Sequence, residues 1–312
     1  MSFAFLPSPA RGLWHLGPIP FRAQALAIAL GIIVAIVVAD RGYRHAGGPR
    51  YVITDIAAWA IPAGLIPAAI GGLTAQARTQ PWQAAHSIDA IVGFPGAVAL
   101  GTLAAWLACR RLRPPAPVAP ASPAVPASPA VPASPAAPAV PAAAPGRRVK
   151  FGPVLAAAAP AIAFGAAVAQ LGAWFTQQGF GHPSSLPWAV EISPVRRPPG
   201  YENFATFTPI FLYQAVWYVT AGIAVLMAAR RFRLSGDRVF ALGAAAYAAA
   251  GFGLFWLGIG HLPIIFGLRA GELGDAAVLV GSAVYLARTR RTRIKSVQAA
   301  HKPALESDSP VM

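Results

Sequence analysis

The chain has 312 residues, of which 56% are hydrophobic and only 11% are charged, with a formal net charge of +15. A soluble domain carries roughly 25% charged residues, so this composition argues against a soluble protein and indicates a polytopic membrane protein. Lys and Arg occur in short clusters between apolar runs rather than on one continuous basic face, so no nucleic-acid partner is expected. The single Cys109 excludes an intrachain disulfide and a CxxC metal site, and we expect a buried or interfacial thiol.

The first third of the chain contains three apolar runs after a polar, proline-containing lead over residues 1–21. The first run, 24–39, reaches the ~20 residues of a membrane span when residues 21–23 are included. The second and third runs cover 52–73 and 88–108, and basic residues follow the first and third runs. Residues 1–113 therefore form the lead and the first three predicted membrane helices.

Residues 114–146 form a Pro/Ala-rich tract in which VPASPA is repeated. Proline supplies no backbone donor, so we expect this tract to be an extended, disordered insertion without a site.

The second half, 147–287, contains four more predicted spans, separated by one long polar segment. The spans cover 151–171, 209–229, 239–258 and 272–287, and the last of them is the shortest. Residues 172–208 form a loop that is rich in aromatic residues and proline, which is typical of an ordered segment that covers or lines a site. Residues 288–312 are expected to be a basic tail.

The distribution of charge predicts how the seven spans are oriented. Placing the N-terminus outside puts 19 of the 25 Lys and Arg residues on the inner side, together with the proline tract and the tail. The positive-inside rule therefore predicts an outer N-terminus, an outer loop 172–208 and a cytoplasmic C-terminus.

Three stretches resemble an actinobacterial-type prolipoprotein diacylglyceryl transferase. They are WHLGPIPFRAQALAIALGI at 14–32, GFPGAVALGTLAAWLACRR at 93–111 and LPWAVEISPVRRPPGYENFATFTPIFLYQAVW at 186–217. The resemblance implies seven membrane helices in a bacterial plasma membrane, with the N-terminus outside. It implies transfer of a diacylglyceryl group from phosphatidylglycerol to the cysteine thiol of a prolipoprotein signal peptide, without a metal or other cofactor.

The chain departs from that family where the family carries charged and polar side chains for chemistry. The family motif GRxGNFxNxE reads AQLGAWFTQQ here, GRFxxE reads GLFWLG, and HPTFLYE reads TPIFLYQ. Two further positions, a tyrosine early in the first span and the GGRLYH motif of the second, are also replaced. The positional equivalents of the family's site residues are Gln24, Ala69, Gln170, Ala173, Thr176, Gln178, Thr208, Gln214, Leu254 and Gly258.

Ionisable groups within a membrane are costly and are normally retained for function, so their replacement predicts degraded or lost transfer activity. A guanidinium pairs well with phosphate, and a leucine cannot replace it. No catalytic residue is therefore assigned. A remaining lipid or substrate pocket could be lined by Gln170, Gln178, His182, Arg197 and Tyr213.

The other candidate residues have simple structural alternatives. His182 could be a base or a hydrogen-bonded loop residue, and Glu191 could form a loop salt bridge with Arg196 or Arg197. Asp55 and Asp275 could pair with or cap neighbouring helices, or could serve function.

The sequence thus predicts an all-α bundle of seven membrane helices with an ordered outer segment. The leading interpretation is a divergent transferase with degraded or lost activity. The alternatives are an active transferase with a rearranged site, and a non-catalytic membrane protein that binds lipid or lipoprotein.

Overall fold

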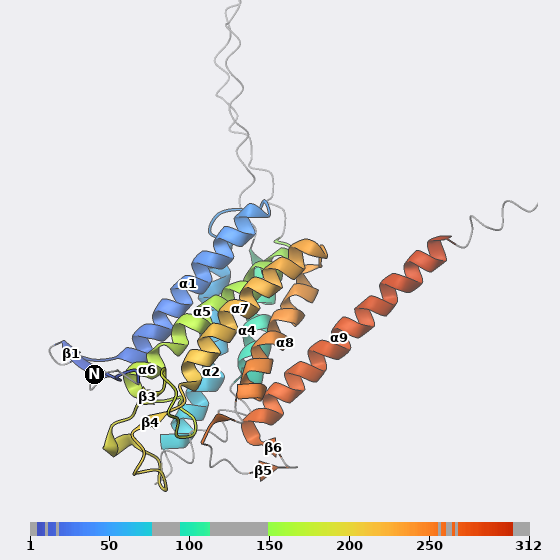
Figure 1. The fold of residues 1–312 in the computed structure, drawn as a ribbon. Coiled ribbons are helices and arrows are strands. Elements are labelled where there is room, and N and C mark those ends of the chain that lie inside the picture. Colours follow the sequence, from blue (N-terminus) through green and yellow to red (C-terminus); the bar gives the residue numbers. More distant parts are fainter. Residues whose placement is uncertain are drawn as a thin grey trace, which may run out of the picture.

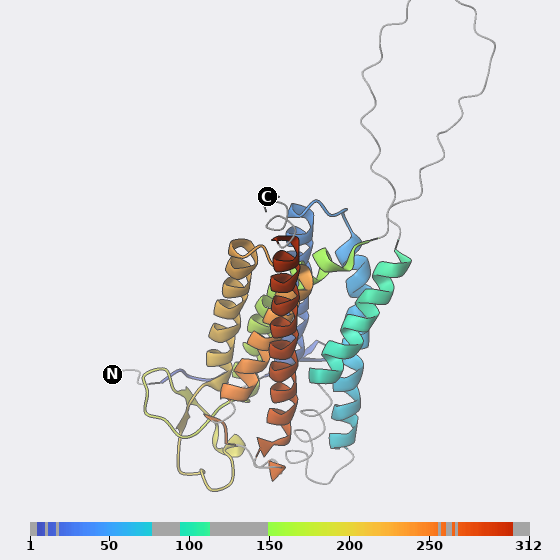
Figure 2. The same cartoon turned by 90° about the vertical axis from the view of Figure 1, so that its right-hand side faces the viewer.

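The computed structural model describes residues 5–9, 12–16, 19–76, 94–112, 149–254, 257–259, 264–265 and 268–301. The predicted proline-rich insertion 114–146, the loop 78–86, Asp89, His261 and the tail beyond 301 lie outside the described residues. Long helices make up most of the described chain, and all but α9 (Ala270–His301), which leans away from the others toward its C-terminal end in Figure 1, run side by side (Figures 1 and 2). They are α1 (Ala23–His45), α2 (Val52–Gln76), α4 (Phe94–Arg111), α5 (Phe151–Gln170), α7 (Ile210–Arg231), α8 (Gly236–Leu254) and α9 (Ala270–His301).

Helix α5 is the centre of the bundle and packs against α1, α7 and α8. Its sequence is rich in alanine and glycine, which lets neighbouring backbones approach closely. Gly165 faces Gly31 of α1, and a Cβ at Gly165 would lie 2.5 Å from the Gly31 carbonyl oxygen. A Cβ at Gly31 would lie 2.4 Å from the Gly165 oxygen, so only glycine fits on either side of this contact.

Three of the described helical segments are long and apolar enough to cross a membrane. They are α1, the segment Phe151–Thr176 and α7. The helices otherwise begin and end close to the predicted spans, and Cys109 is buried as expected, at 2% exposure.

Helix α9 corrects the expectation that the seventh helix is the shortest. It is 32 residues long and continues from the apolar segment through the basic residues as far as His301. Hydropathy marks where a helix can lie in lipid, whereas Ala, Arg and Lys favour helix beyond that point. The expected boundary at residue 288 is therefore not a helix end.

Residues 171–209, which we call the cap, are all described and cover one end of the bundle (Figure 1). The cap contains α6 (Gly172–Thr176), β3 (Val190–Glu191), the 3₁₀-helix Pro194–Arg196 and β4 (Thr206–Phe207). Strands β3 and β4 pair antiparallel, with Val190 opposite Phe207. The predicted loop 172–208 thus carries short helices and a strand pair between α5 and α7.

The N-terminal lead also takes part in the cap, which was not predicted. It forms the antiparallel hairpin β1 (Leu13–Leu16) and β2 (Ile19–Arg22), and Leu6 pairs with Val190. The Leu6 N–H donates to the Ala189 carbonyl at 2.7 Å, and the Glu191 N–H donates to the Leu6 carbonyl at 3.1 Å. These bonds join residues far apart in sequence, so the local hydropathy pattern could not predict them.

A small apolar core joins the cap to the bundle. Phe207 is 0% exposed, and it lies in one cluster with Val190, Ile192, Ala173 and Phe211. Because Phe211 belongs to α7 whereas the other four residues belong to the cap, the cap is packed onto the start of α7 and is not a free loop.

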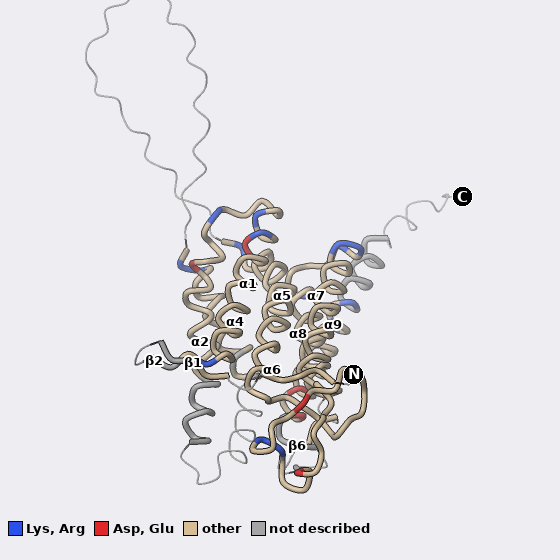
Figure 3. The backbone as a smooth tube through the Cα atoms, turned by 60° about the vertical axis from the view of Figure 1, so that its left-hand side comes forward, with Lys and Arg blue, Asp and Glu red and all other residues tan. Residues whose placement is uncertain are grey.

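Positive charge collects at the end of the bundle opposite the cap (Figure 3). The described basic residues at the helix ends there are Arg41, Arg44, Arg50, Arg110, Arg111, Lys150, Arg230, Arg231, Arg233, Arg238, Arg288 and Arg290. At the capped end, Arg22, Arg196 and Arg197 lie in or beside the cap. We call the end of the bundle opposite the cap the basic end.

Candidate functional site at the capped end of the bundle

The positions singled out in the sequence gather at the capped end. Helix α5 ends there at Gln170, α8 ends at Leu254, and α1 and α7 begin there. Ala69 lies in the half of α2 that ends on the same side. The full set at this end is Gln24, Ala69, Gln170, Ala173, Thr176, Gln178, Thr208, Gln214, Leu254 and Gly258.

Within the cap, the turn after α6 is fixed by Gln177 rather than by Gln178. Gln177 has φ 52° and is buried, and its Oε1 accepts bonds from the N–H (3.1 Å) and Oγ (2.6 Å) of Ser193. Gln178 is exposed, and its N–H donates to the Ala173 carbonyl at 3.0 Å. Thr176 Oγ1 donates to carbonyls of its own helix. Ala173, Thr176 and Gln178 therefore build the turn, and Gln177 was missed by the motif comparison.

Thr208, His182 and Gly258 meet through their backbones. The Thr208 hydroxyl and N–H both donate to the His182 carbonyl, at 3.1 and 3.0 Å. The His182 N–H donates to the Leu257 carbonyl at 3.2 Å, and Gly181 forms a bridge with Gly258. These bonds join three segments, at residues 181–182, 208 and 257–258, beside the start of α7 and the end of α8. The His182 ring itself is exposed and lies edge-on to Tyr201, with centroids 6.2 Å apart.

The loop arginines bind backbone oxygens. Arg197 donates through Nε to the Ile192 carbonyl (3.1 Å) and through Nη1 to the Glu202 carbonyl (2.8 Å). Arg196 donates to the Thr176 carbonyl. The expected salt bridge to Glu191 is therefore replaced by bonds that hold the loop in shape.

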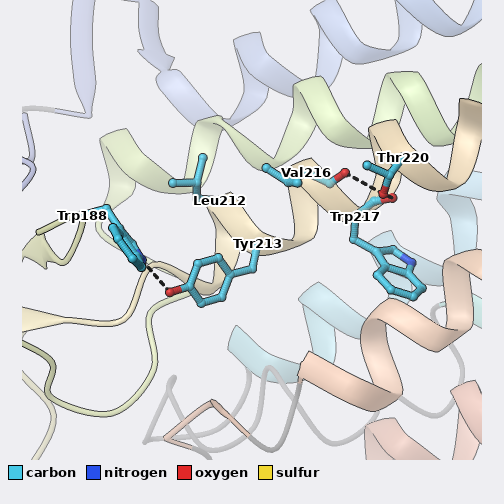
Figure 4. A pocket seen from close by; sticks show the side chains of 6 residues that line it. All are labelled: Trp188, Leu212, Tyr213, Val216, Trp217 and Thr220. Carbon is cyan, nitrogen blue, oxygen red and sulfur yellow. Dashed lines mark hydrogen bonds between the residues drawn. The ribbon is translucent and has the colours of Figure 1, made fainter. Parts of the chain in front are cut away.

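The remaining predicted pocket residue, Tyr213, lies on the first turn of α7. Its hydroxyl accepts a bond from Trp188 Nε1 at 2.8 Å, so the start of α7 is tied to the cap (Figure 4). The contacts of the described residues thus give Gln178, His182, Arg197 and Tyr213 four different environments. They do not bring these side chains together into one pocket.

Gln170 contributes instead to a polar cluster inside the bundle. Its side chain lies within hydrogen-bonding reach of the Tyr218 hydroxyl. Tyr218 is 2% exposed and stacks on Tyr247 of α8, with ring centroids 4.7 Å apart. The Asp275 carboxylate of α9 lies against Gly251, where an added Cβ would be 2.0 Å from Oδ2. Glu272, 1% exposed, lies one turn before Asp275.

This polar cluster was largely missed from the sequence. Only Gln170 and Asp275 were singled out, and neither was connected with the tyrosines. A usable signal was present, because Glu272 and Asp275 are three residues apart and so share one face of a helix. Tyr218 and Tyr247 lie in long apolar runs, a pattern that predicts ordinary core residues.

Leu254 and Gln24 show what stands at two other positions of the family motifs. Leu254 packs against the hydrophobic cluster of Ala167, Tyr218 and Ala250, together with Tyr247. Gln24 lies beside Gly172, and its Oε1 is buried without a hydrogen-bond partner among the described residues. Gln214 lies half-buried on the first turns of α7.

Asp55 is exposed in the first turn of α2, where a carboxylate interacts favourably with the helix dipole. Among the described residues, no three His, Cys, Asp or Glu side chains lie together in a way that could hold a metal ion.

Comparison with known proteins covers nearly the whole chain. A family model described as prolipoprotein diacylglyceryl transferase matches residues 11–131 and 137–273. The chain is 34% identical over 292 residues to phosphatidylglycerol–prolipoprotein diacylglyceryl transferase 2 of Streptomyces coelicolor, covering 92% of this chain and 81% of that protein.

Relatives from two other genera agree. The phosphatidylglycerol–prolipoprotein diacylglyceryl transferase of Frankia alni is 36% identical over 301 residues, covering 93% of this chain and 69% of the relative. The protein of the same name from Mycobacterium leprae is 34% identical over 301 residues, covering 90% and 81%. The chain therefore belongs to the prolipoprotein diacylglyceryl transferase family, a family of membrane proteins.

Proposed function

We propose that the chain crosses the bacterial plasma membrane seven times, with the cap and N-terminus outside and the C-terminus in the cytoplasm. The seven long described helices and the charge at their ends support this arrangement. Cytoplasmic loops carry an excess of Lys and Arg, and the basic end has that excess. Leu112 and Val149 lie next to α4 and α5 at the basic end, so the insertion 114–146 between them would be cytoplasmic.

The names of the relatives indicate diacylglyceryl transfer, and this reaction requires particular groups at the site. Transfer to a prolipoprotein would need a cysteine thiolate to attack the glyceryl carbon next to the phosphate of phosphatidylglycerol. An S–C bond forms, the C–O bond to phosphate breaks, glycerol phosphate leaves, and a base accepts the thiol proton. This reaction needs a base beside the thiol and a cation beside the departing phosphate.

We infer that this chain keeps the frame of the family while diacylglyceryl transfer is degraded or lost. The observation that carries the proposal is the packing of Leu254, at a position where the resemblance implies an arginine, against the cluster of Ala167, Tyr218 and Ala250. Gln170, at the second arginine position, faces Tyr218 and offers no charge. Neither residue can pair with a phosphate as a guanidinium does.

The arginines of the cap do not compensate for this loss. Arg196 and Arg197 already donate to the carbonyls of Thr176, Ile192 and Glu202, and moving them would undo the turn. The ligands expected for the retained frame are phosphatidylglycerol and the signal peptide of a prolipoprotein, bound without cofactor and without efficient transfer. The protein would then act as a membrane protein that binds lipid or lipoprotein.

One observation favours a second candidate, an active transferase with a rearranged site. Asp275 reaches the bundle interior beside Gly251, in the same region as Gln170 and Tyr218. A carboxylate there could accept the thiol proton that the family's lost acids would otherwise take. Tyrosine hydroxyls could donate to a phosphate oxygen, although more weakly than a guanidinium.

Complementation separates the two candidates. The chain is expressed in cells depleted of their own transferase, and a reporter prolipoprotein is followed by mass spectrometry. The proposal predicts that the reporter stays at its unmodified mass although the chain is present in the membrane fraction. A diacylglyceryl mass shift would reject the proposal. In that case, loss of the shift in Asp275→Asn would support the rearranged site.

A further inference from the structure

An open apolar groove lies on one face of α7 beside the cap. Its volume is about 440 Å³, and it is lined by Trp188, Leu212, Tyr213, Val216, Trp217 and Thr220 (Figure 4). All but Trp188 come from two turns of α7, where their spacing places them on one face of the helix. Trp188 comes from the cap and closes the groove at that end.

The groove offers almost no polar group along its length. Thr220 Oγ1 donates to the carbonyls of Val216 (3.0 Å) and Trp217 (2.9 Å) of its own helix. Trp217 Nε1 donates to the Ala246 carbonyl of α8 at 2.8 Å, and this bond fixes the orientation of the indole that lines one side of the groove. Side chains satisfied in this way favour an apolar occupant.

The end of the groove at the cap is polar. Tyr213 accepts a bond from Trp188 Nε1, so its own hydroxyl proton remains free to donate to a second acceptor. Trp and Tyr pairs of this kind are typical of the membrane interface, where lipid ester and phosphate oxygens lie. The groove therefore has the polarity of a phospholipid, with one polar end and one apolar end.

The length of the groove agrees with one leaflet. From Leu212 to Thr220 the helix rises about 12 Å, which is less than half of the ~30 Å hydrocarbon core. Val216 in its floor is 56% exposed, so the protein does not cover it. Since α7 is itself long and apolar enough to cross a membrane, the available occupant is an acyl chain of the surrounding bilayer.

We propose that this groove binds one acyl chain of an outer-leaflet phospholipid, with the ester and phosphate end at the Trp188–Tyr213 pair. The proposal rests on the membrane orientation proposed above. Lipid tails are as apolar as the groove, so selectivity must come from the rigid aromatic walls and from the Tyr213 hydroxyl. The occupant would be held beside Gln214 and the other positions at the capped end.

The test uses the full chain in phosphatidylglycerol nanodiscs that contain a phospholipid with a diazirine in its tail. After irradiation, mass spectrometry maps the adducts. We expect labelling to concentrate on 212–220 and to fall about tenfold in Val216→Trp, as a loss of ~1.4 kcal/mol of contact energy would cause. Thr220→Phe fills the other end of the groove and should act similarly. The matched control is Val219→Trp, which is exposed on α7 outside the groove and should leave labelling unchanged.

The outcomes distinguish this proposal from the proposed function. Equal labelling of the groove, of Val219 and of exposed residues on α1 and α5 would mean annular lipid only. This result would reject specific binding in the groove but would leave the proposed membrane orientation intact. Absence of labelling on every helix would overturn both. Reporter modification in the complementation assay tests the loss of transfer alone and is independent of the groove.

Discussion

In the bundle, helices approach one another through glycine and alanine, as where Gly31 meets Gly165 backbone to backbone. In the cap, short segments are tied by backbone and side-chain hydrogen bonds, as where the Gly181 N–H donates to the Thr208 carbonyl at 2.8 Å. Each helix satisfies its own backbone, so the bundle needs only close packing. The cap has little regular structure and must find a partner for each buried polar group.

The comparison explains where function can vary. Positions at the helix ends border both regions, where Leu254 is held by apolar packing and Thr208 by hydrogen bonds. Under the proposed function, the packing of both regions is kept although diacylglyceryl transfer is degraded or lost. Four predictions test this division between the two regions.

The largest expected effect concerns the core of the cap. Phe207→Ala removes a fully buried ring that holds β4 against Val190 and Ile192, so we expect a loss of about 3–5 kcal/mol. Chemical denaturation in detergent, followed by limited proteolysis, should show the cap opening first. Phe204→Ala, at a site 49% exposed, is the control and should change stability by no more than about 0.5 kcal/mol.

In the bundle, Gly165→Leu should separate α1 from α5. The added side chain meets the Gly31 carbonyl and the Ala35 Cβ, 2.9 Å from an added Cβ, and overpacking of this kind costs about 1–3 kcal/mol. Thermal unfolding in detergent should show a lower midpoint for the whole protein. Gly281→Leu is the matched control, because nothing lies within 4 Å of a Cβ there. If both variants behaved alike, the glycine contact would not hold the bundle together.

Gln177 and Gln178 allow a contrast between neighbours within the cap. Gln177→Ala leaves the Ser193 N–H without its acceptor, and a loss of about 1 kcal/mol is expected. Gln178→Ala, at the exposed position equivalent to a family glutamate, should leave stability nearly unchanged. Denaturant midpoints of the two variants would check this, and a larger effect at Gln178 would contradict the assignment of the turn.

The smallest effect concerns the basic end, where Tyr285 donates to the Asp237 carboxylate. This bond is the main cause that lowers the pKa of Asp237, so the carboxylate stabilises the fold above its unfolded pKa of about 3.9 and loses that contribution as pH falls through the folded value. We expect less than about 1 kcal/mol for so exposed a pair. Unfolding midpoints at pH 7 and below pH 4 should differ less in Asp237→Asn than in the parent protein.

The helices of the bundle could be predicted from the sequence because the hydropathy of a span is local. The runs beginning at residues 52, 151 and 209 correspond closely to α2, α5 and α7. The end of α9 could not be predicted in this way, since helix propensity carries it beyond the apolar segment to His301.

The site was predicted in part. Except at the end of α9, the sequence located the ends of the helices, and positions such as Gln170 and Leu254 lie at such ends. It did not indicate that Arg197 and Gln177 would be committed to the backbone of the cap, or that Asp275 would meet Gly251. These contacts join distant segments, and no local pattern encodes them.

The most direct test of the retained frame is transfer by the purified chain in phosphatidylglycerol vesicles. A lipobox peptide is the acceptor, and its mass is measured after incubation. The account predicts no diacylglyceryl adduct with the parent protein and a detectable adduct after Gln170→Arg, Leu254→Arg and Gly258→Glu are combined. An adduct of the same yield with the unaltered chain would contradict it.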